Sequence, residues 1–219
     1  MKLVATIYPP IEVFDEVADA SDLDALLALR VRTDPLLGEG IQRALTIPPE
    51  DRAYGPGAGY VMAPFAHPSV EGTRFGPPAL SAPSFGVYYS ARDEATSIAE
   101  VRHHRTAFLR ATRAVGQDLD FEVITAPVKG SRFFDLRDRK KEFPAIYSPT
   151  DYSRSQRFAV EVRGKDADGI AYDSVRRVGG ECLAVFRPRC VGPCNVVKQL
   201  IFRWDGDDIS AVLEAHQLG

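Results

Sequence analysis

The chain has 219 residues, of which 45% are hydrophobic and 26% charged, and its formal net charge is −3 at pH 7. This length and balance are ordinary for a globular protein and provide for one sizeable domain. The slightly acidic net charge argues against nucleic acid as the main partner, because such partners usually require a basic face, although it leaves room for a local basic patch; we expect no direct nucleic-acid binding by this chain.

The first residues do not indicate secretion. The apolar run at the N-terminus is short, is interrupted by Pro9 and Pro10, and is followed by acidic residues instead of a cleavage site. No apolar stretch approaches the ~20 residues that a membrane helix needs. Together with the frequent use of Ala, Arg, Gly and Asp, these features predict a cytoplasmic bacterial protein with no membrane partner.

The N-terminal third begins with a predicted helix and continues into a region that is rich in Pro and Gly. Residues 13–31 carry apolar side chains at helical spacing in their second half, and Ser21 is the expected N-cap. From 41 to 83 no long periodic pattern occurs, and such a region is usually functional or disordered. Within it, YVMAPF at 60–65 predicts an edge strand, because Pro64 cannot donate to a central ladder.

The rest of the chain mixes strands and helices without regular alternation. A strand at 86–90 leads into a helix that Ser90 would cap and that runs to about residue 112. The later predicted elements are strands at 121–128 and 131–137 joined by a Lys129-Gly130 turn, a helix at 151–163, strands at 169–175 and 182–188 joined by Gly179-Gly180, a strand at 197–204 and a short C-terminal helix from 209. This order predicts an α+β fold whose strands are mostly antiparallel, with flanking helices.

Several common catalytic and metal motifs are absent from the sequence. There is no GxxxxGK[ST] phosphate loop, no HExxH zinc motif and no GxSxG nucleophile elbow. Cys190 and Cys194 lie four residues apart without a second pair of ligands, and three cysteines do not make a disulfide framework. His103 and His104 would point about 100° apart on a helix and cannot chelate together. We therefore expect no metal.

Four polar positions remain as candidates for a site: Arg74 in EGTRFGPP, Tyr89 at the end of the 86–90 strand, Glu100 eleven residues later, and Ser174 in GIAYDSVRR. Each has an ordinary explanation when it is taken singly, as a surface arginine, a core tyrosine, a solvated helix position or a strand hydroxyl. Glu100, however, lies beside an apolar stripe of its helix, where a partly buried carboxylate requires a partner or a function.

These positions occur in an ordered set of short motifs: GTRFG (72–76), VYYSARDEATSIAE (87–100), SRSQRFA (153–159) and DGIAYDSVRRVGGECLAVF (168–186). The set resembles the RES domain, which is named for its Arg, Glu and Ser and is the toxin half of bacterial toxin–antitoxin pairs. The resemblance covers most of the chain from residue 72 onward. It implies a single domain over 1–219, with an N-terminal helix and Pro/Gly-rich extension at 1–71 and a core at 72–219.

RES proteins resemble ADP-ribosyltransferases of the diphtheria and cholera toxin type and consume NAD. The resemblance therefore implies an ADP-ribosyltransferase-like core, NAD as substrate, and a helix-turn-helix antitoxin that covers the active site. Cleavage of NAD passes through an oxocarbenium-like transition state, which a carboxylate at Glu100 could stabilise. An arginine suits the pyrophosphate, and Arg74 is the expected one, with Arg32 as an alternative.

The remaining expected roles follow from side-chain chemistry. Tyr89 presents a flat face to nicotinamide, and Ser174 can position the ribose or the arginine by a hydrogen bond. His104, four residues after Glu100 on the same helical face, can reach the phosphate region.

Three functions stay open at the level of sequence. The leading hypothesis is the toxin of a type II toxin–antitoxin system that transfers ADP-ribose from NAD to a bacterial target protein, a mono-ADP-ribosyltransferase. The long segment 36–83, which we expect to shape acceptor access, favours this hypothesis. The alternatives are an NAD glycohydrolase or phosphorylase that depletes the dinucleotide, and a non-catalytic binding module.

Overall fold

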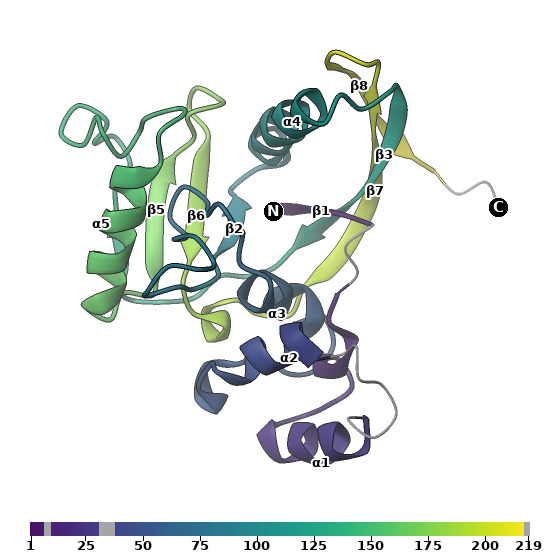
Figure 1. Cartoon of the computed structure of the whole chain (residues 1–219), viewed down its shortest axis with the longest axis vertical. Coiled ribbons are helices and arrows are strands. Elements are labelled where there is room, and N and C mark those ends of the chain that lie inside the picture. Colours follow the sequence, from purple (N-terminus) through teal and green to yellow (C-terminus); the bar gives the residue numbers. More distant parts are fainter. Residues whose placement is uncertain (7–9, 31–37, 217–219) are drawn as a thin grey trace.

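The computed structural model describes residues 1–6, 10–30 and 38–216 and contains two four-stranded sheets (Figure 1). Sheet 1 has the order β1 (Lys2–Ala5), β3 (Gln117–Thr125), β7 (Asn195–Trp204) and β8 (Ile209–Ala215). Sheet 2 has the order β2 (Tyr88–Ala91), β6 (Glu181–Val185), β5 (Gly169–Asp173) and β4 (Phe133–Asp135). Neighbouring strands are antiparallel except for the parallel pair β4–β5.

The helices lie between the two sheets, on sheet 2 and beside the sheets. The longest, α4 (Glu94–Ala111), runs between them, and α5 (Ser153–Gly164) packs on sheet 2, while α1 (Ala20–Arg30), α2 (Gly38–Leu45) and α3 (Ala58–Ala66) lie together on one side (Figure 1). The described residues also contain three short 3-10 turns: η1 (Glu12–Phe14), η3 (Pro49–Asp51) and η4 (Pro188–Cys190). The predicted α+β class with mostly antiparallel strands is confirmed. None of the helices in the described ranges is long and apolar enough to cross a membrane.

The core is divided among the layers that these elements form. Sheet 2 and α5 bury Ile170, Ala184 and Ala159, while α4 and sheet 1 bury Leu109 and Phe121. Burial of these apolar surfaces is the main stabilising term of both layers.

Two predicted helix caps were wrong by a few residues. Ser90 does not cap α4, because β2 continues to Ala91 and Ser90 still pairs with β6. The cap is Asp93, whose side chain accepts a 2.8 Å hydrogen bond from the amide N–H of Thr96. At α1, the amide N–H of Ser21 donates to Asp19 Oδ1 at 2.8 Å, so the carboxylate before Ser21 holds the helix start.

The predicted strand at 60–65 is wrong, because these residues form most of helix α3. Buried residues recur there at Ala58, Val61, Met62 and Phe65, which is a helical period, and they pack on two sides at once. Pro64 lies inside this helix near its end. The Pro/Gly-rich region 41–83 is accordingly less irregular than predicted, since it contains the end of α2 as well as η3 and α3.

Two predictions of local topology also failed. The residues from 209 form strand β8 instead of a helix, because the turn Asp205–Asp208 folds the chain back onto β7 with Gly206 at φ +108°. The strands β3 and β4 do not form the predicted hairpin about Lys129-Gly130, since they belong to different sheets. The predicted hairpin of 169–175 and 182–188 is confirmed by the antiparallel pairing of β5 with β6.

The N-terminal part is joined to the rest of the molecule by strand pairing and by ion pairs. β1 is the edge strand of sheet 1, and the carbonyl of Met1 accepts hydrogen bonds from Ala91 N at 2.8 Å and Ser97 Oγ at 3.0 Å. The buried carboxylate of Asp51 pairs with Arg187 at 2.7 Å and with Arg189 at 2.5 Å. The first residues of the chain therefore lie at the junction of the two sheets.

Candidate active site

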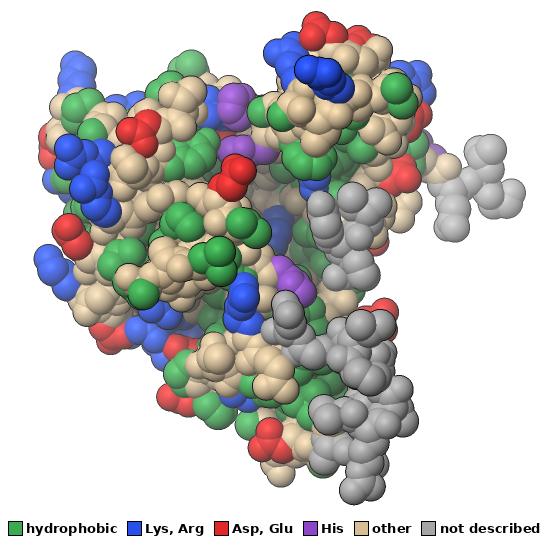
Figure 2. Space-filling model, viewed as in Figure 1, with side chains coloured by type: hydrophobic (Ala, Val, Ile, Leu, Met, Phe, Trp, Pro, Cys, Tyr) green, Lys and Arg blue, Asp and Glu red, His purple; other side chains and the backbone are tan. Residues whose placement is uncertain are grey.

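A cleft of about 890 Å³ opens between the two sheets. Its walls come from β1, the loop 69–74, β2, α4 and the segment 150–156, and Figure 2 shows the hollow with Lys or Arg side chains at its floor. The volume lies within the ~300–1,000 Å³ that is usual for small-molecule sites. Arg74, Tyr89, Glu100 and His104 all line it.

Glu100 and Ser174 are in direct contact. Ser174 Oγ donates a 2.6 Å hydrogen bond to Glu100 Oε1, although the two residues are far apart in the sequence. Ser174 is 1% exposed, and its hydroxyl accepts hydrogen bonds from the amide N–H groups of Arg176 and Arg177, both at 3.0 Å. Because these two N–H groups occupy the oxygen as an acceptor, the hydroxyl proton is directed at the carboxylate. Ser174 therefore positions Glu100, and it does not position Arg74 as one expectation had it.

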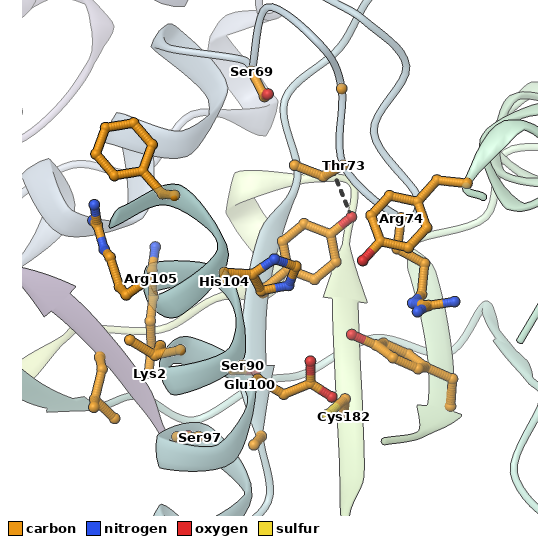
Figure 3. Close-up of a pocket in the computed structure, with 18 of the residues that line it drawn as sticks. Lys2, Ser69, Thr73, Arg74, Ser90, Ser97, Glu100, His104, Arg105 and Cys182 are labelled. Carbon is orange, nitrogen blue, oxygen red and sulfur yellow. Dashed lines mark hydrogen bonds between the residues drawn. The ribbon is translucent and has the colours of Figure 1, made fainter. Parts of the chain in front are cut away.

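Tyr89 faces the cleft because strand β2 alternates its side chains. Tyr88 points the other way and is 1% exposed, which confirms its predicted packing inside. The Tyr89 hydroxyl forms a 2.8 Å hydrogen bond with Thr73 Oγ1, drawn in Figure 3, and accepts another of 2.8 Å from Phe75 N. Burial raises the pKa of Tyr89 to about 12, so the hydroxyl stays protonated at neutral pH. Its two partners flank Arg74, so Tyr89 fixes the loop that carries this arginine.

Arg74 is a buried cation on the wall of the cleft, with 7% of its surface exposed. Its Nη1 donates to the carbonyls of Ile146 at 2.9 Å and Ser148 at 3.0 Å, and its guanidinium carbon lies 4.7 Å from the ring centroid of Tyr152. Within the described ranges, no carboxylate forms an ion pair with Arg74. Its positive charge is thus held in place by two carbonyls and an aromatic ring, and no described carboxylate neutralises it.

Tyr152 is a cleft residue that the sequence analysis did not identify. Its ring packs on Arg74, and its hydroxyl accepts a 3.3 Å hydrogen bond from Arg176 Nη2. Arg176 also donates to the carbonyl of Pro149. The segment 146–152 therefore contacts both Arg74 and the turn that orients Ser174. The only signal for Tyr152 in the sequence was its place next to the SRSQRFA motif.

His104 follows Glu100 by one helical turn and lines the same cleft. Although the residue as a whole is exposed, the protein removes water from around the imidazole and this desolvation lowers its pKa to about 4, with the positive charges of His103 and Arg176 as further causes. The imidazole is therefore neutral at physiological pH and offers a hydrogen bond but no charge. Arg32, the alternative pyrophosphate ligand, lies outside the described residues.

The wall near Glu100 is completed by Tyr172 and Cys182. Burial raises the pKa of both side chains, that of Cys182 to about 12, so the thiol is protonated and is no nucleophile at neutral pH. In the part of the chain that the structure describes, no group of three His, Cys, Asp or Glu side chains is placed to hold a metal ion.

The placement of Glu100 and Arg74 favours one kind of ligand. Glu100 extends from α4 toward the side of the cleft that carries Arg74 and Cys182 (Figure 3). A fixed carboxylate in a partly dry cleft stabilises positive charge that develops on a bound molecule, and a fixed guanidinium attracts an anionic group of the same molecule. The site is therefore suited to a ligand that carries phosphate and becomes cationic at a carbon centre as it reacts.

Comparison with known proteins identifies the family. The RES domain matches residues 49–205. The chain is 28% identical over 215 residues to the uncharacterized protein y4oC of Sinorhizobium fredii (strain NBRC 101917 / NGR234), covering 95% of this chain and 84% of that protein. It is also similar to a chain of the crystal structure of the M. tuberculosis MbcT–MbcA toxin–antitoxin complex. The TM-score is 0.44 and the sequence identity 17%, and the match covers 63% of this chain and 74% of that one. Because the family match spans well over half of its length, this chain belongs to the RES domain family.

Proposed function

We propose that this protein is the toxin of a type II toxin–antitoxin system, and that it cleaves NAD and transfers the ADP-ribose to a bacterial protein. Membership of the RES domain family supports the toxin role and NAD as the substrate. The contact between Ser174 Oγ and Glu100 Oε1 in the cleft carries the chemical part of the proposal.

In the proposed reaction the bond between ribose C1′ and the nicotinamide nitrogen breaks. The electron pair leaves with nicotinamide, which becomes a neutral ring, and the positive charge moves to the ribose. Glu100 stabilises this charge, and Ser174 keeps the carboxylate oriented while it does so. A nucleophile of the acceptor then forms a bond to C1′ and loses its proton to solvent.

The other cleft residues serve binding in this proposal. Arg74 faces the phosphate that is attached to the nicotinamide ribose, and its charge is available to that phosphate because no carboxylate of the described residues forms an ion pair with it. The ring of Tyr89 lies against nicotinamide, while its hydroxyl holds the loop of Arg74. His104 donates to the phosphates as a neutral imidazole.

A protein acceptor is favoured over water by the surface beside the cleft. The loop that contributes Ser69 and Glu71 to the cleft also carries Val70 and Leu80, which are 72% and 90% exposed. A protein that docks beside the cleft could bury these two apolar side chains, whereas water as the acceptor would leave them exposed. The same surface is available to the helix-turn-helix antitoxin that we propose covers the cleft and silences the toxin.

The proposal can be tested with NAD that is labelled on its adenylate half. Purified protein is incubated with this NAD in the presence and absence of bacterial lysate, beside Glu100→Gln and the exposed control Glu161→Gln on α5. We expect a labelled protein band with lysate for the wild type and the control, and none for Glu100→Gln. Label found only in a small molecule would instead identify an NAD-depleting enzyme, and full activity of Glu100→Gln would exclude this carboxylate from the chemistry.

A further inference from the structure

One face of α4 lines the cleft along most of its length. The residues that do so are Ser97, Glu100, Val101, His104, Arg105 and Phe108, which recur every three or four positions. At a rise of 1.5 Å per residue, Phe108 lies about 12 Å beyond Glu100 along the helix axis. The cleft therefore continues for two further helical turns past the carboxylate that we place at the reacting sugar.

Two cations line the cleft on the side away from Arg74. Lys2 and Arg105 lie on one side of His104, and Arg74 lies on the other (Figure 3). Lys2 Nζ is 4.1 Å from the ring centroid of Tyr88, and no carboxylate of the described residues forms an ion pair with it. Burial lowers the pKa of Lys2 to about 7, so its charge is poorly stabilised until an anion binds beside it.

Phe108 supplies an exposed aromatic ring in the same half of the cleft. Its side chain is 54% exposed, whereas Phe121, which also lines the cleft, is 1% exposed. Packing within the protein therefore leaves much of the Phe108 ring open to the cleft. An open aromatic face next to cationic side chains is the combination that binds a nucleotide, because the base stacks and the phosphates pair with the cations.

We propose that Lys2, Arg105 and Phe108 form a subsite for the adenylate half of the substrate, with the phosphate next to the adenosine at the two cations and the adenine on the Phe108 ring, while Arg74 keeps the phosphate next to the reacting ribose. This inference rests on the proposed function, because it places the reacting ribose at Glu100. Along the face of α4 the order is then ribose, phosphates and adenine, which is the covalent order in the dinucleotide. It follows that the enzyme selects a dinucleotide over nicotinamide mononucleotide, which lacks the adenylate half.

Binding of ADP, which cannot react, tests the subsite without any turnover. Isothermal titration calorimetry would compare the wild type with Phe108→Ala, Phe108→Trp and the control Val115→Ala, which removes an apolar side chain that is 80% exposed outside the cleft. We expect Phe108→Ala to weaken ADP binding roughly five- to hundredfold and the other two variants to bind like the wild type. Lys2→Met should weaken binding about tenfold and reduce its salt dependence, while Lys2→Arg should keep both.

Turnover separates this inference from the proposed function. If the subsite exists, Phe108→Ala lowers kcat/KM for NAD and narrows the preference for NAD over nicotinamide mononucleotide. ADP binding as expected, without turnover of NAD by the wild type, would leave the subsite in place and overturn the proposed reaction. Two outcomes would overturn the subsite alone. In the first, the wild type turns over NAD, and both Phe108→Ala and Lys2→Met keep its ADP binding and its substrate preference. In the second, Phe108→Ala fails only in binding the antitoxin.

Discussion

Removal of the Ser174 hydroxyl tests whether Glu100 has to be held in place. In Ser174→Ala the carboxylate loses a 2.6 Å hydrogen bond, and the amide N–H groups of Arg176 and Arg177 lose their 3.0 Å acceptor. A hydrogen bond to a charged group contributes about 1.5–3 kcal/mol, and the loss of an acceptor for buried amides adds about 1 kcal/mol or more. Because Ser174 is 1% exposed, water does not readily replace the hydroxyl.

From these terms we expect a loss of stability of about 3 kcal/mol and a decrease of Tm by roughly 6–12 °C for a chain of this size. The orienting bond to Glu100 alone corresponds to a decrease in kcat of about ten- to hundredfold, at 1.36 kcal/mol per factor of ten. Far-UV circular dichroism and a thermal melt measure the first effect. Release of nicotinamide from NAD, followed by chromatography well below the melting temperature, measures the second.

The matched control is Ser155→Ala. This serine is also buried, and its hydroxyl donates to the carbonyl of Tyr152 at 3.0 Å without touching Glu100. It should lose some stability and keep its kcat. In the double variant with Glu100→Gln, removal of the Ser174 hydroxyl should have little further effect on the residual rate, because the group it orients is already altered. A folded Ser174→Ala enzyme with wild-type kcat would refute the positioning role.

Three further predictions follow from other contacts. Tyr89→Phe removes both hydrogen bonds of the hydroxyl, leaves the Phe75 N–H without its acceptor and loosens the loop of Arg74. We therefore expect the free energy of unfolding, measured with denaturant, to fall by about 1–3 kcal/mol and the KM for NAD to rise. Asp51→Asn breaks two ion pairs of a buried carboxylate and should lower stability by about 2–3 kcal/mol, whereas Glu50→Gln, at an exposed neighbouring position, should stay within about 0.5 kcal/mol of the wild type. His104 has its folded-state pKa lowered to about 4 from an ordinary value of 6.5, so the unfolded chain binds more protons between these limits and stability falls as pH falls through them. His104→Gln should therefore lose less Tm between pH 6.5 and pH 4 than the wild type.

Local patterns in the sequence were sufficient for the elements whose hydrogen bonds are short in range. The helix after Tyr89 and the antiparallel pair β5–β6 could be predicted because periodicity and turn residues act within a few positions. The strand β8 was within reach of the same reasoning, since Asp205-Gly206 is a hairpin signal. The helix at 58–66 was missed because a single proline outweighed an apolar period of three to four residues.

The sequence by itself therefore determined the fold class, the family and several of the polar residues that line the cleft, among them Arg74, Tyr89 and Glu100. The tertiary structure decided how they act on one another: Ser174 holds Glu100, Tyr89 holds the loop of Arg74, and Tyr152 covers this arginine. Each of these contacts joins segments that lie far apart in the chain, and no pattern within one segment specifies which side chain of another will meet it. For the same reason the position of Lys2 in the cleft could not be predicted from the sequence, since it results from the pairing of β1 with β3 at the junction of the two sheets.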